Sequence, residues 1–298
     1  MQPVWTIGMA QIAPRLGDVE ANLSHHLEII HAARERGVDL LVFPELSLTG
    51  YFLKDLVPVV ARPAVTEDPI LGRLAEQSHD MDIVVGFVEE DPRYRYFVSA
   101  AYLSRGRIVH VHRKIYLPTY SMFDEGRYVA AGRGLQAFDA RLGRLGMLIC
   151  EDFWHLSPPY CLWLDGADVL IHISASPGRG LSGPETGRLA STRFVENINR
   201  VYAAALTTFV IHVNRVGFED GVNFWGGSFC VGPDGEVLAQ APYFEEALLT
   251  AQIDLAELRR VRSRLPLLRD ERPELVMRFL QRLLDGSSRL GTEDALNA

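Results

Sequence analysis

The stretch GMLICEDFWH, residues 146–155, decides how this chain of 298 residues is interpreted. It opens with a continuous apolar run of the kind that forms a buried strand, and that run ends at Cys150. Glu151 and Asp152 follow at once, and a nearby negative charge disfavours the thiolate form of a cysteine. Core packing explains a free cysteine here as well as chemistry does, so the rest of the sequence has to separate the two interpretations.

Strand and helix patterns alternate on both sides of this stretch. Apolar runs predict strands at residues 4–11, 39–45, 82–90, 144–150, 168–176 and 206–214, with hairpins at 96–114 and 224–240. Period-3.6 patterns predict helices at residues 19–37, 68–80 and 184–204. Such a mixture predicts an α/β fold with mixed sheets covered by helices. We expect one domain over residues 1–298, ending in an Arg- and Leu-rich helical segment from about 254 to 298.

The composition excludes several classes of protein. A net charge of −8 argues against a nucleic-acid groove or an anionic membrane surface as partner. The longest apolar stretch, residues 201–213, is shorter than the roughly 20 residues that span a bilayer. The three cysteines lack the C-x-x-C spacing of a zinc or redox site, and the N-terminus has no signal-peptide pattern. The sequence therefore predicts a soluble cytoplasmic protein that acts on small molecules.

Three titratable side chains stand where predicted strands end: Glu45 in VFPELSLTGY, Lys114 in HVHRKIYLP, and Cys150. Each alone has an ordinary explanation, as an exposed glutamate, a surface lysine and a packed thiol. Together they form a sufficient set for attack on an amide carbonyl. Glu45 would take the thiol proton, and Lys114 with the backbone N–H of Glu151 would stabilise the oxyanion.

The three motifs resemble those of the nitrilase superfamily of carbon–nitrogen hydrolases. FPELSLTGY, HRKIYLP and LICEDFW match its Glu-Lys-Cys triad in order, and the similarity runs over about the whole chain. The branch with the most similar motifs is the glutaminase domain of glutamine-dependent NAD synthetases, on the stretches RKIYLPTYSMFDEGRYVAAG, SASP and NRVGFEDGVNFWGGSFCVGPDGEVL. The resemblance implies a four-layer αββα sandwich with two mixed sheets. It also implies cleavage of a primary amide through a cysteine thioester, with release of ammonia.

Further roles follow from the same resemblance. Glu125 matches an additional acid that positions the lysine and assists proton transfer. Tyr51, Tyr120, Glu151 and Ser176 match positions that line the glutamine pocket in the synthetase branch. Glu151 would then receive the α-ammonium of an amino-acid substrate, which gives the acidic residue beside the thiol a function in recognition.

Two departures from the synthetase branch limit this interpretation. An S-G-G-x-D-S loop for ATP is absent, and no glycine-rich stretch fits a phosphate loop, so this polypeptide is not expected to make NAD by itself. The loop at residues 177–188 also differs, which leaves the substrate open. Arg179 or Arg188 could meet a substrate carboxylate, although a solvated arginine is the simpler explanation of each.

Several alternatives remain open at this point. The chain could supply ammonia in trans to a separate synthetase, could hydrolyse nitriles or N-carbamoyl compounds, or could be a catalytically silent binding protein. No cofactor is required, and no metal is expected, because His110 and His112 share a strand face without a third ligand nearby. By analogy with the family we expect a homo-oligomer, a dimer or larger, in which the C-terminal helical segment forms a subunit contact.

Overall fold

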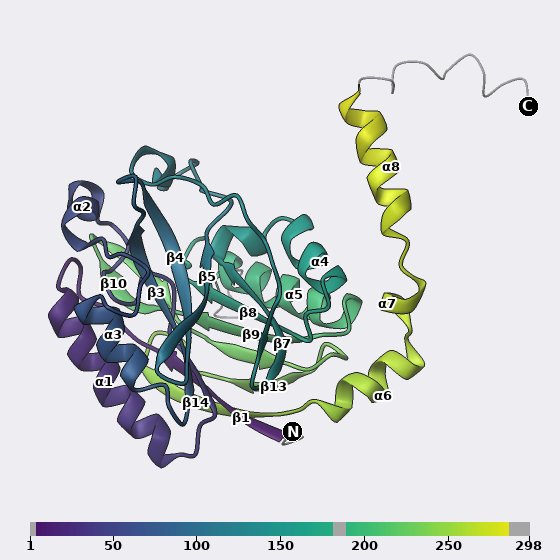
Figure 1. Cartoon of the computed structure of the whole chain (residues 1–298), viewed down its shortest axis with the longest axis horizontal. Helices are drawn as coiled ribbons and strands as arrows, with labels where there is room; N and C mark the ends of the chain where they lie inside the picture. Colours follow the sequence, from purple (N-terminus) through teal and green to yellow (C-terminus); the bar gives the residue numbers. More distant parts are fainter. Residues whose placement is uncertain (1–3, 181–188, 286–298) are drawn as a thin grey trace, which may run out of the picture.

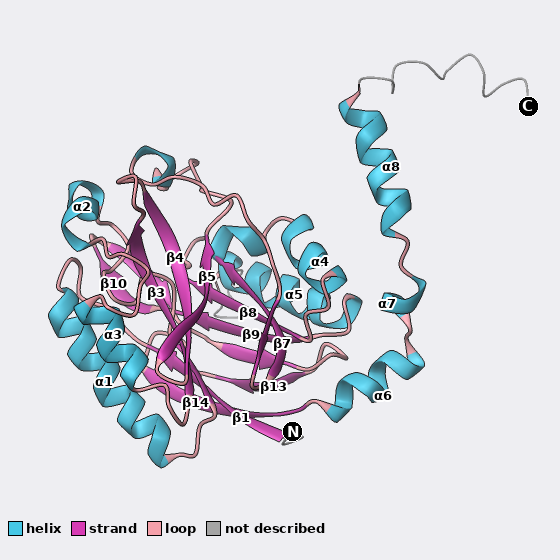
Figure 2. Ribbon diagram, viewed as in Figure 1, coloured by secondary structure: helices cyan, strands magenta, loops and turns pink. Residues whose placement is uncertain are grey.

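Two six-stranded sheets lie face to face in the computed structural model, which describes residues 4–180 and 189–285 (Figure 2). The first sheet has the order β14-β1-β2-β3-β4-β5. Its strands are β1 (Val4–Gln11), β2 (Leu40–Val42), β3 (Asp82–Glu90), β4 (Tyr96–Ser104), β5 (Arg107–Arg113) and β14 (Ala247–Asp254). The central strands β1, β2 and β3 run parallel, and the outer pairs are antiparallel, so the sheet is mixed as expected.

The second sheet has the order β13-β12-β9-β8-β7-β6, again with three parallel strands at its centre, β7, β8 and β9. Its strands are β6 (Phe138–Ala140), β7 (Gly143–Ile149), β8 (Val169–Ser174), β9 (Phe209–Asn214), β12 (Phe229–Val231) and β13 (Val237–Gln240). A separate two-stranded ribbon joins β10 (Val216–Glu219) to β11 (Val222–Trp225). Both predicted hairpins are confirmed, and Arg105 and Gly106 take positive φ angles in the first turn, at 53° and 76°.

Helices cover the outer face of each sheet, which completes the four-layer αββα arrangement (Figure 1). The first sheet carries α1 (Val19–Glu35) and α3 (Pro69–Glu76), and the second carries α4 (Ser157–Leu164) and α5 (Ala190–Ala205). Asp68 begins α3 by accepting hydrogen bonds from the N–H groups of Ile70 and Leu71, both at 2.9 Å. Short helices lie at α2 (Val57–Val60) and η1 (Lys54–Leu56). The predicted fold class is confirmed.

Strand β7 shows how one apolar run serves two cores. Met147 and Ile149 point into the core between the sheets, whereas Leu148 packs into a second core beneath α4 and α5. Successive strand residues face opposite sides, so a strand buried on both faces has to be apolar throughout. That requirement explains the unbroken apolar run before Cys150.

The chain leaves the sandwich after β14 through α6 (Ala256–Arg264), α7 (Leu267–Asp270) and α8 (Pro273–Leu284), which extend away from the sheets in Figure 1. α6 is anchored by buried Leu258 and Val261. Arg262 reinforces that contact through a 2.7 Å bond to Asp168. α8 buries none of its residues. Among the described residues, no helix combines the length and apolar character needed to span a bilayer.

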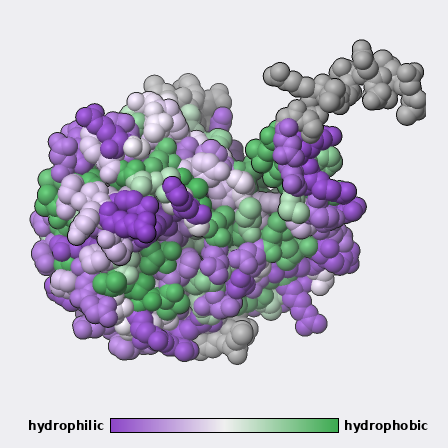
Figure 3. Space-filling view, turned by 45° about the horizontal axis from the view of Figure 1, so that its top comes forward, coloured by the Kyte–Doolittle hydropathy of each residue, from purple (hydrophilic) through white to green (hydrophobic). Residues whose placement is uncertain are grey.

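The surface of the sandwich mixes polar and apolar side chains, and apolar residues also reach the surface of the C-terminal segment (Figure 3). Within α8 these include Met277, Phe279 and Leu284, which are 63%, 54% and 86% exposed. Exposed apolar groups gathered on one short helix are more than the scattered ones that a soluble surface normally shows. The segment therefore carries apolar surface that the sandwich does not cover.

Candidate active site

The site lies where the parallel strands of both sheets end. Glu45 comes three residues after β2 in the first sheet, while Cys150 and Ala175 directly follow β7 and β8 in the second. A hydrogen bond of 2.7 Å from Ala175 N to Glu45 Oε2 joins the two ends. Carboxyl ends of parallel strands are a common place for binding groups in open α/β sheets, and here two such edges face each other.

Lys114 connects two buried carboxylates at this point. Its Nζ lies 2.7 Å from Glu45 Oε1 and 2.7 Å from Glu125 Oε1, and all three side chains are buried. Burial opposes the charged ammonium, but the charges of Glu125 and Glu45 outweigh it, so the pKa of Lys114 lies well above its ordinary value. The lysine is therefore a fixed positive charge that acts on the space beside Cys150.

Cys150 occupies a strained backbone position. It opens the short 3₁₀ helix η3 (Cys150–Phe153) and has a φ of 46°, in the left-handed region that a residue with a Cβ rarely adopts. A sharp turn of this kind at the end of a strand directs the side chain away from the sheet, and it brings the next backbone N–H close to the nucleophile. The strain is consistent with a functional position.

The thiol of Cys150 is held in its protonated form. Burial raises its pKa well above the ordinary value, the charge of Glu45 adds to that rise, and Lys114 and a hydrogen bond with Ser174 only partly offset it. A neutral thiol is a weak nucleophile and needs a neighbouring base. Among the acids, Glu45 raises the pKa of the thiol most, although Glu151 is the one next to Cys150 in the sequence.

Glu125 is the other acid of the cluster, at the start of η2 (Glu125–Arg127). Its Oε1 accepts hydrogen bonds from Lys114 Nζ at 2.7 Å and from the Tyr51 hydroxyl at 2.5 Å. Burial raises its pKa to about 7, because it outweighs the charge of Lys114, and the charge of Glu45 raises the pKa further. Glu125 can therefore exchange a proton near neutral pH.

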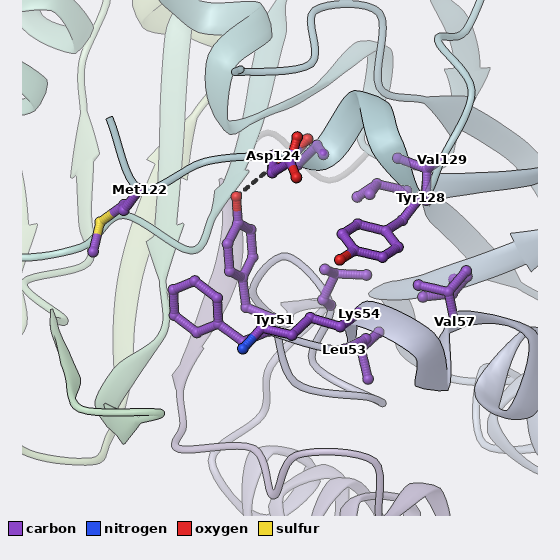
Figure 4. Close-up of a pocket in the computed structure, with 13 residues that line it drawn as sticks. Tyr51, Leu53, Lys54, Val57, Met122, Asp124, Tyr128 and Val129 are labelled. Carbon is purple, nitrogen blue, oxygen red and sulfur yellow. Dashed lines mark hydrogen bonds between the residues drawn. The ribbon is translucent and has the colours of Figure 1, made fainter. Parts of the chain in front are cut away.

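Tyr51 lines a neighbouring apolar pocket that does not include Cys150. Figure 4 shows this pocket, whose lining Tyr51 shares with Leu53, Val57 and Tyr128. The Tyr51 hydroxyl donates a hydrogen bond to Glu125 Oε1. The structure thus places Tyr51 behind Glu125, where it positions that acid. Its role in substrate binding stays a prediction.

A pocket of about 90 Å³ has Cys150 in its lining. Three of the four residues expected to bind substrate line it, Tyr120, Glu151 and Ser176. The Tyr120 hydroxyl donates to Glu151 Oε2 at 3.0 Å. The backbone N–H of Ser176 donates to Asn214 Oδ1 at 2.8 Å, which fixes this wall of the pocket.

Arg179 also lines this pocket and stacks on the Phe123 ring, with 4.6 Å between the guanidinium carbon and the ring centroid. Its Nη2 is buried without a hydrogen-bond partner among the described residues. Of the two arginines considered from sequence, Arg179 thus faces the pocket, whereas Arg188 lies outside the described residues, as does the loop portion 181–188.

Sequence reasoning missed two groups beside the nucleophile. Ser174, at the end of β8, hydrogen-bonds the Cys150 thiol. Asp152 is fully buried, and its Oδ2 lies 2.8 Å from His112 Nε2, so the two residues form a histidine–carboxylate pair. His110 instead stacks on Phe138. The period-2 spacing of the two histidines was a correct signal for a shared strand, but the acid that joins one of them comes from η3, which follows β7 of the other sheet.

Comparison with known proteins agrees with this geometry. The family model described as carbon–nitrogen hydrolase matches residues 6–263. The glutamine-dependent NAD(+) synthetase of Thermotoga maritima is 34% identical over 261 residues, which cover 86% of this chain and 43% of the relative. N-carbamoylputrescine amidase of Solanum tuberosum is 28% identical over 285 residues, covering 91% of this chain and 93% of the relative.

A solved structure shows the same fold over nearly its whole length. The carbon–nitrogen hydrolase from Helicobacter pylori G27 has a TM-score of 0.81 and 27% identity, and the match covers 94% of this chain and 98% of that one. By contrast, the chain spans less than half the length of the NAD(+) synthetases that it matches. Fold, ordered motifs and family match lead to one conclusion: this chain belongs to the carbon–nitrogen hydrolase family, within the nitrilase superfamily.

Proposed function

We propose that the chain hydrolyses a small primary amide through a thioester on Cys150, with Glu45 as general base and Lys114 as an oxyanion donor. One observation carries the proposal. A buried carboxylate and a buried ammonium lie 2.7 Å apart, and both charges act on a thiol whose pKa is raised. A thiol in that state needs a base, and Glu45 is held in place for this role by Ala175 N and Lys114 Nζ.

The proposed reaction has two stages, attack of Cys150 on the amide and hydrolysis of the resulting thioester. Glu45 takes the thiol proton while Sγ bonds to the amide carbon, and the carbonyl electron pair moves to oxygen. Lys114 Nζ and the Glu151 N–H donate to that oxyanion. The C–N bond then breaks, and Glu45 returns its proton to the departing nitrogen, so ammonia leaves. Water, deprotonated by Glu45, then attacks the thioester carbon. The C–S bond breaks, the carboxylic acid forms, and Glu45 returns its proton to the Cys150 sulfur.

Glu125 would keep Lys114 in position and assist proton transfer. Because its pKa is about 7, it holds a proton for part of the time at neutral pH and can relieve the negative charge around the lysine. Its hydrogen bonds to Lys114 and Tyr51 support a positioning role.

The substrate class that the pocket supports best is an α-amino acid with a side-chain amide, such as L-glutamine. The pocket wall carries a carboxylate, Glu151 with Tyr120 bonded to it, and a guanidinium, Arg179, with an unpartnered buried donor among the described residues. Those two charges match an α-ammonium and an α-carboxylate. The NAD(+) synthetase relatives are glutamine-dependent by name, which supports the same substrate.

An N-carbamoyl amine is the second candidate, because the potato N-carbamoylputrescine amidase matches along 93% of its length. A diamine derivative would bring positive charge into the pocket. Glu151 suits such a substrate, but Arg179 does not. The Arg179 guanidinium therefore favours L-glutamine over an N-carbamoyl amine as the substrate.

The test is release of ammonia from L-glutamine, from butyramide, which lacks both α-groups, and from N-carbamoylputrescine. Wild type, Cys150→Ala and Cys230→Ala are run together, since Cys230 is a second buried thiol, on β12, outside the Cys150 pocket. We expect Cys150-dependent release that is fastest from L-glutamine. Fastest release from N-carbamoylputrescine would show that the substrate is an N-carbamoyl amine and not glutamine. Ammonia release unaffected by Cys150→Ala would overturn the mechanism.

Glutamine hydrolysis yields ammonia that a synthetase could use, so we propose a separate ammonia-accepting synthetase as a partner. The supporting observation is the likeness to the NAD(+) synthetases over only part of their length. A cytoplasmic location would bring the two together, and none of the three cysteines forms a disulfide, as is usual in a reducing compartment.

We also propose that the helical segment after residue 254 forms a contact between copies of the chain. Val276, Phe279, Leu280 and Leu283 share one face of α8, and each is at least 36% exposed. An isolated helix of 12 residues is marginal in water, so a partner surface is expected. Light scattering should give a dimer or larger for wild type and a smaller species for Phe279→Glu; a monomeric wild type would contradict this.

A further inference from the structure

Asp152 is a buried carboxylate without a part in the steps above, although it lies two residues from the nucleophile. Each of its oxygens accepts two hydrogen bonds. Oδ1 accepts from the N–H groups of Ile115 and Tyr116, both at 2.9 Å. Oδ2 accepts from His112 Nε2 at 2.8 Å and from Ile149 N at 3.1 Å. Burial alone would raise its pKa, but His112 and the N–H donors hold that pKa below its ordinary value.

The partners of Asp152 surround the two residues that have to act together. His112 and Ile115 lie on either side of Lys114 along the chain, and Ile149 directly precedes Cys150. Lys114 directly follows β5 of the first sheet, whereas Cys150 follows β7 of the second. Within the described residues these two sheets share no ladder of backbone hydrogen bonds. Their relative position at the site therefore depends on the core packed between them and on side-chain links such as this one.

We infer that Asp152, with His112 as its partner, is a positioning residue that sets Lys114 against Cys150 so that the oxyanion meets both of its donors. The inference rests on the proposed function. An oxyanion donor works over a narrow range, about 2.7–3.1 Å from the oxygen, and a misplacement of about 1 Å can lower the rate about 100-fold. The carboxylate acts on the geometry of the transition state and does not touch the substrate, because it is fully buried beneath the turn.

The chain offers a matched control. Asp82, on β3, is also a buried carboxylate that links the two sheets, because it accepts a hydrogen bond from Arg141 Nε at 2.9 Å. Within its own sheet it accepts a second one from the Tyr102 hydroxyl, at 2.7 Å. Arg141 lies in the turn between β6 and β7, at the opposite end of β7 from Cys150. Asp82→Asn therefore removes a charge of the same kind from the same interface, but away from the site.

The experiment compares Asp152→Asn with Asp82→Asn in the full chain, with ammonia release and with the rate of Cys150 alkylation by iodoacetamide. We expect Asp152→Asn to lower kcat about 10- to 100-fold with KM changed less than about threefold, whereas Asp82→Asn keeps kcat within about twofold of wild type. His112→Gln, which retains a donor for Asp152, should stay closer to wild type than His112→Leu.

The outcomes separate this inference from the proposed function. If wild type releases no ammonia and iodoacetamide does not label Cys150 in preference to Cys230, the other buried thiol, the proposed function fails. If wild type is active and Asp152→Asn loses no more kcat than Asp82→Asn, the positioning role fails. That role also fails if Asp152→Asn raises KM and leaves kcat unchanged. Should Asp152→Asn not fold, the two His112 variants decide. The positioning role then fails if His112→Leu loses no more kcat than His112→Gln.

Discussion

The centre of the candidate site and the rim of its pocket differ in how firmly they are held. Glu45 and Lys114 are fully buried, and each makes two hydrogen bonds of 2.7 Å to groups from other elements. On the rim, Tyr120 is 46% exposed and Arg179 keeps a donor without a partner among the described residues. In the proposed function, the centre fixed by many contacts would carry out the reaction, whereas the rim with unsatisfied groups would select the substrate. Changes at the two places should therefore have different signatures.

The largest effect is expected at the centre, from Cys150→Ala. Without the nucleophile no thioester forms, and amide hydrolysis should fall by at least about 10⁴-fold, the scale of loss when a member of a catalytic unit is removed. Steady-state ammonia release measures it. Cys230→Ala is the control, because that thiol is also buried, with a pKa raised to about 12, but does not line the Cys150 pocket. Equal losses of activity in both variants would contradict the assignment of Cys150, and not Cys230, as the nucleophile.

Removing the central cation should act on stability as well as on rate. Lys114→Met leaves Glu45 and Glu125 buried without their shared partner, and breaking such a pair lowers the free energy of unfolding by about 3–5 kcal/mol. Urea unfolding at pH 7 measures the change. The double variant Lys114→Met/Glu125→Gln carries one buried charge fewer and should recover part of the loss. A double variant no more stable than the single one would show that the cluster is not held by charge.

The pH dependence of stability tests whether the centre shifts the pKa of Glu125. Its pKa rises from 4.5 to about 7 on folding, so between these values the folded chain holds the proton more firmly than the unfolded chain does. Raising the pH through this window therefore destabilises the fold, by no more than about 3 kcal/mol, and the effect levels off above pH 7. Urea midpoints of wild type and Glu125→Gln between about pH 4.5 and 8 should converge at low pH. Parallel curves would contradict the shift.

The smallest effect is expected at the rim. Arg179→Gln removes a charged donor that lines the pocket, and KM for L-glutamine should rise about 10-fold with kcat nearly unchanged. Butyramide, which lacks the α-carboxylate, serves as the control and should be hydrolysed as by wild type. A fall in kcat for both amides would show that Arg179 acts on the reaction, as the residues of the centre do, and would contradict its assignment to substrate binding at the rim.

The sequence points to the residues of the centre more directly than to those of the rim, for a physical reason. Strands buried on both faces are recognisable as apolar runs, so the titratable residues that end them, Glu45, Lys114 and Cys150, stand out. The triad motifs in order then specified the αββα sandwich. Ser174 and Asp152 were missed because their importance depends on which strand ends face each other across the sheets, a fact of packing that no local pattern contains.

The rim was less predictable because it is made of loops. Tyr120, Glu151 and Ser176 came from resemblance and do line the pocket, while Tyr51 lies behind Glu125 and reaches that acid rather than the pocket. Arg179 could be named from sequence but not distinguished from any solvated arginine. Only its stacking on Phe123 and its place in the pocket wall make that distinction.

The pairing of β1 with β14 has a consequence for how the chain is made. The first strand pairs over its whole length with the last, Val4 opposite Asp254 and Gln11 opposite Ala247. The buried Gln11 side chain donates to the carbonyl oxygens of Pro242 and Glu245, both at 2.7 Å. During synthesis every residue of the site leaves the ribosome before this partner strand exists. The first sheet must therefore wait with an open edge until residue 254 emerges, so its closure is a late, long-range step of folding.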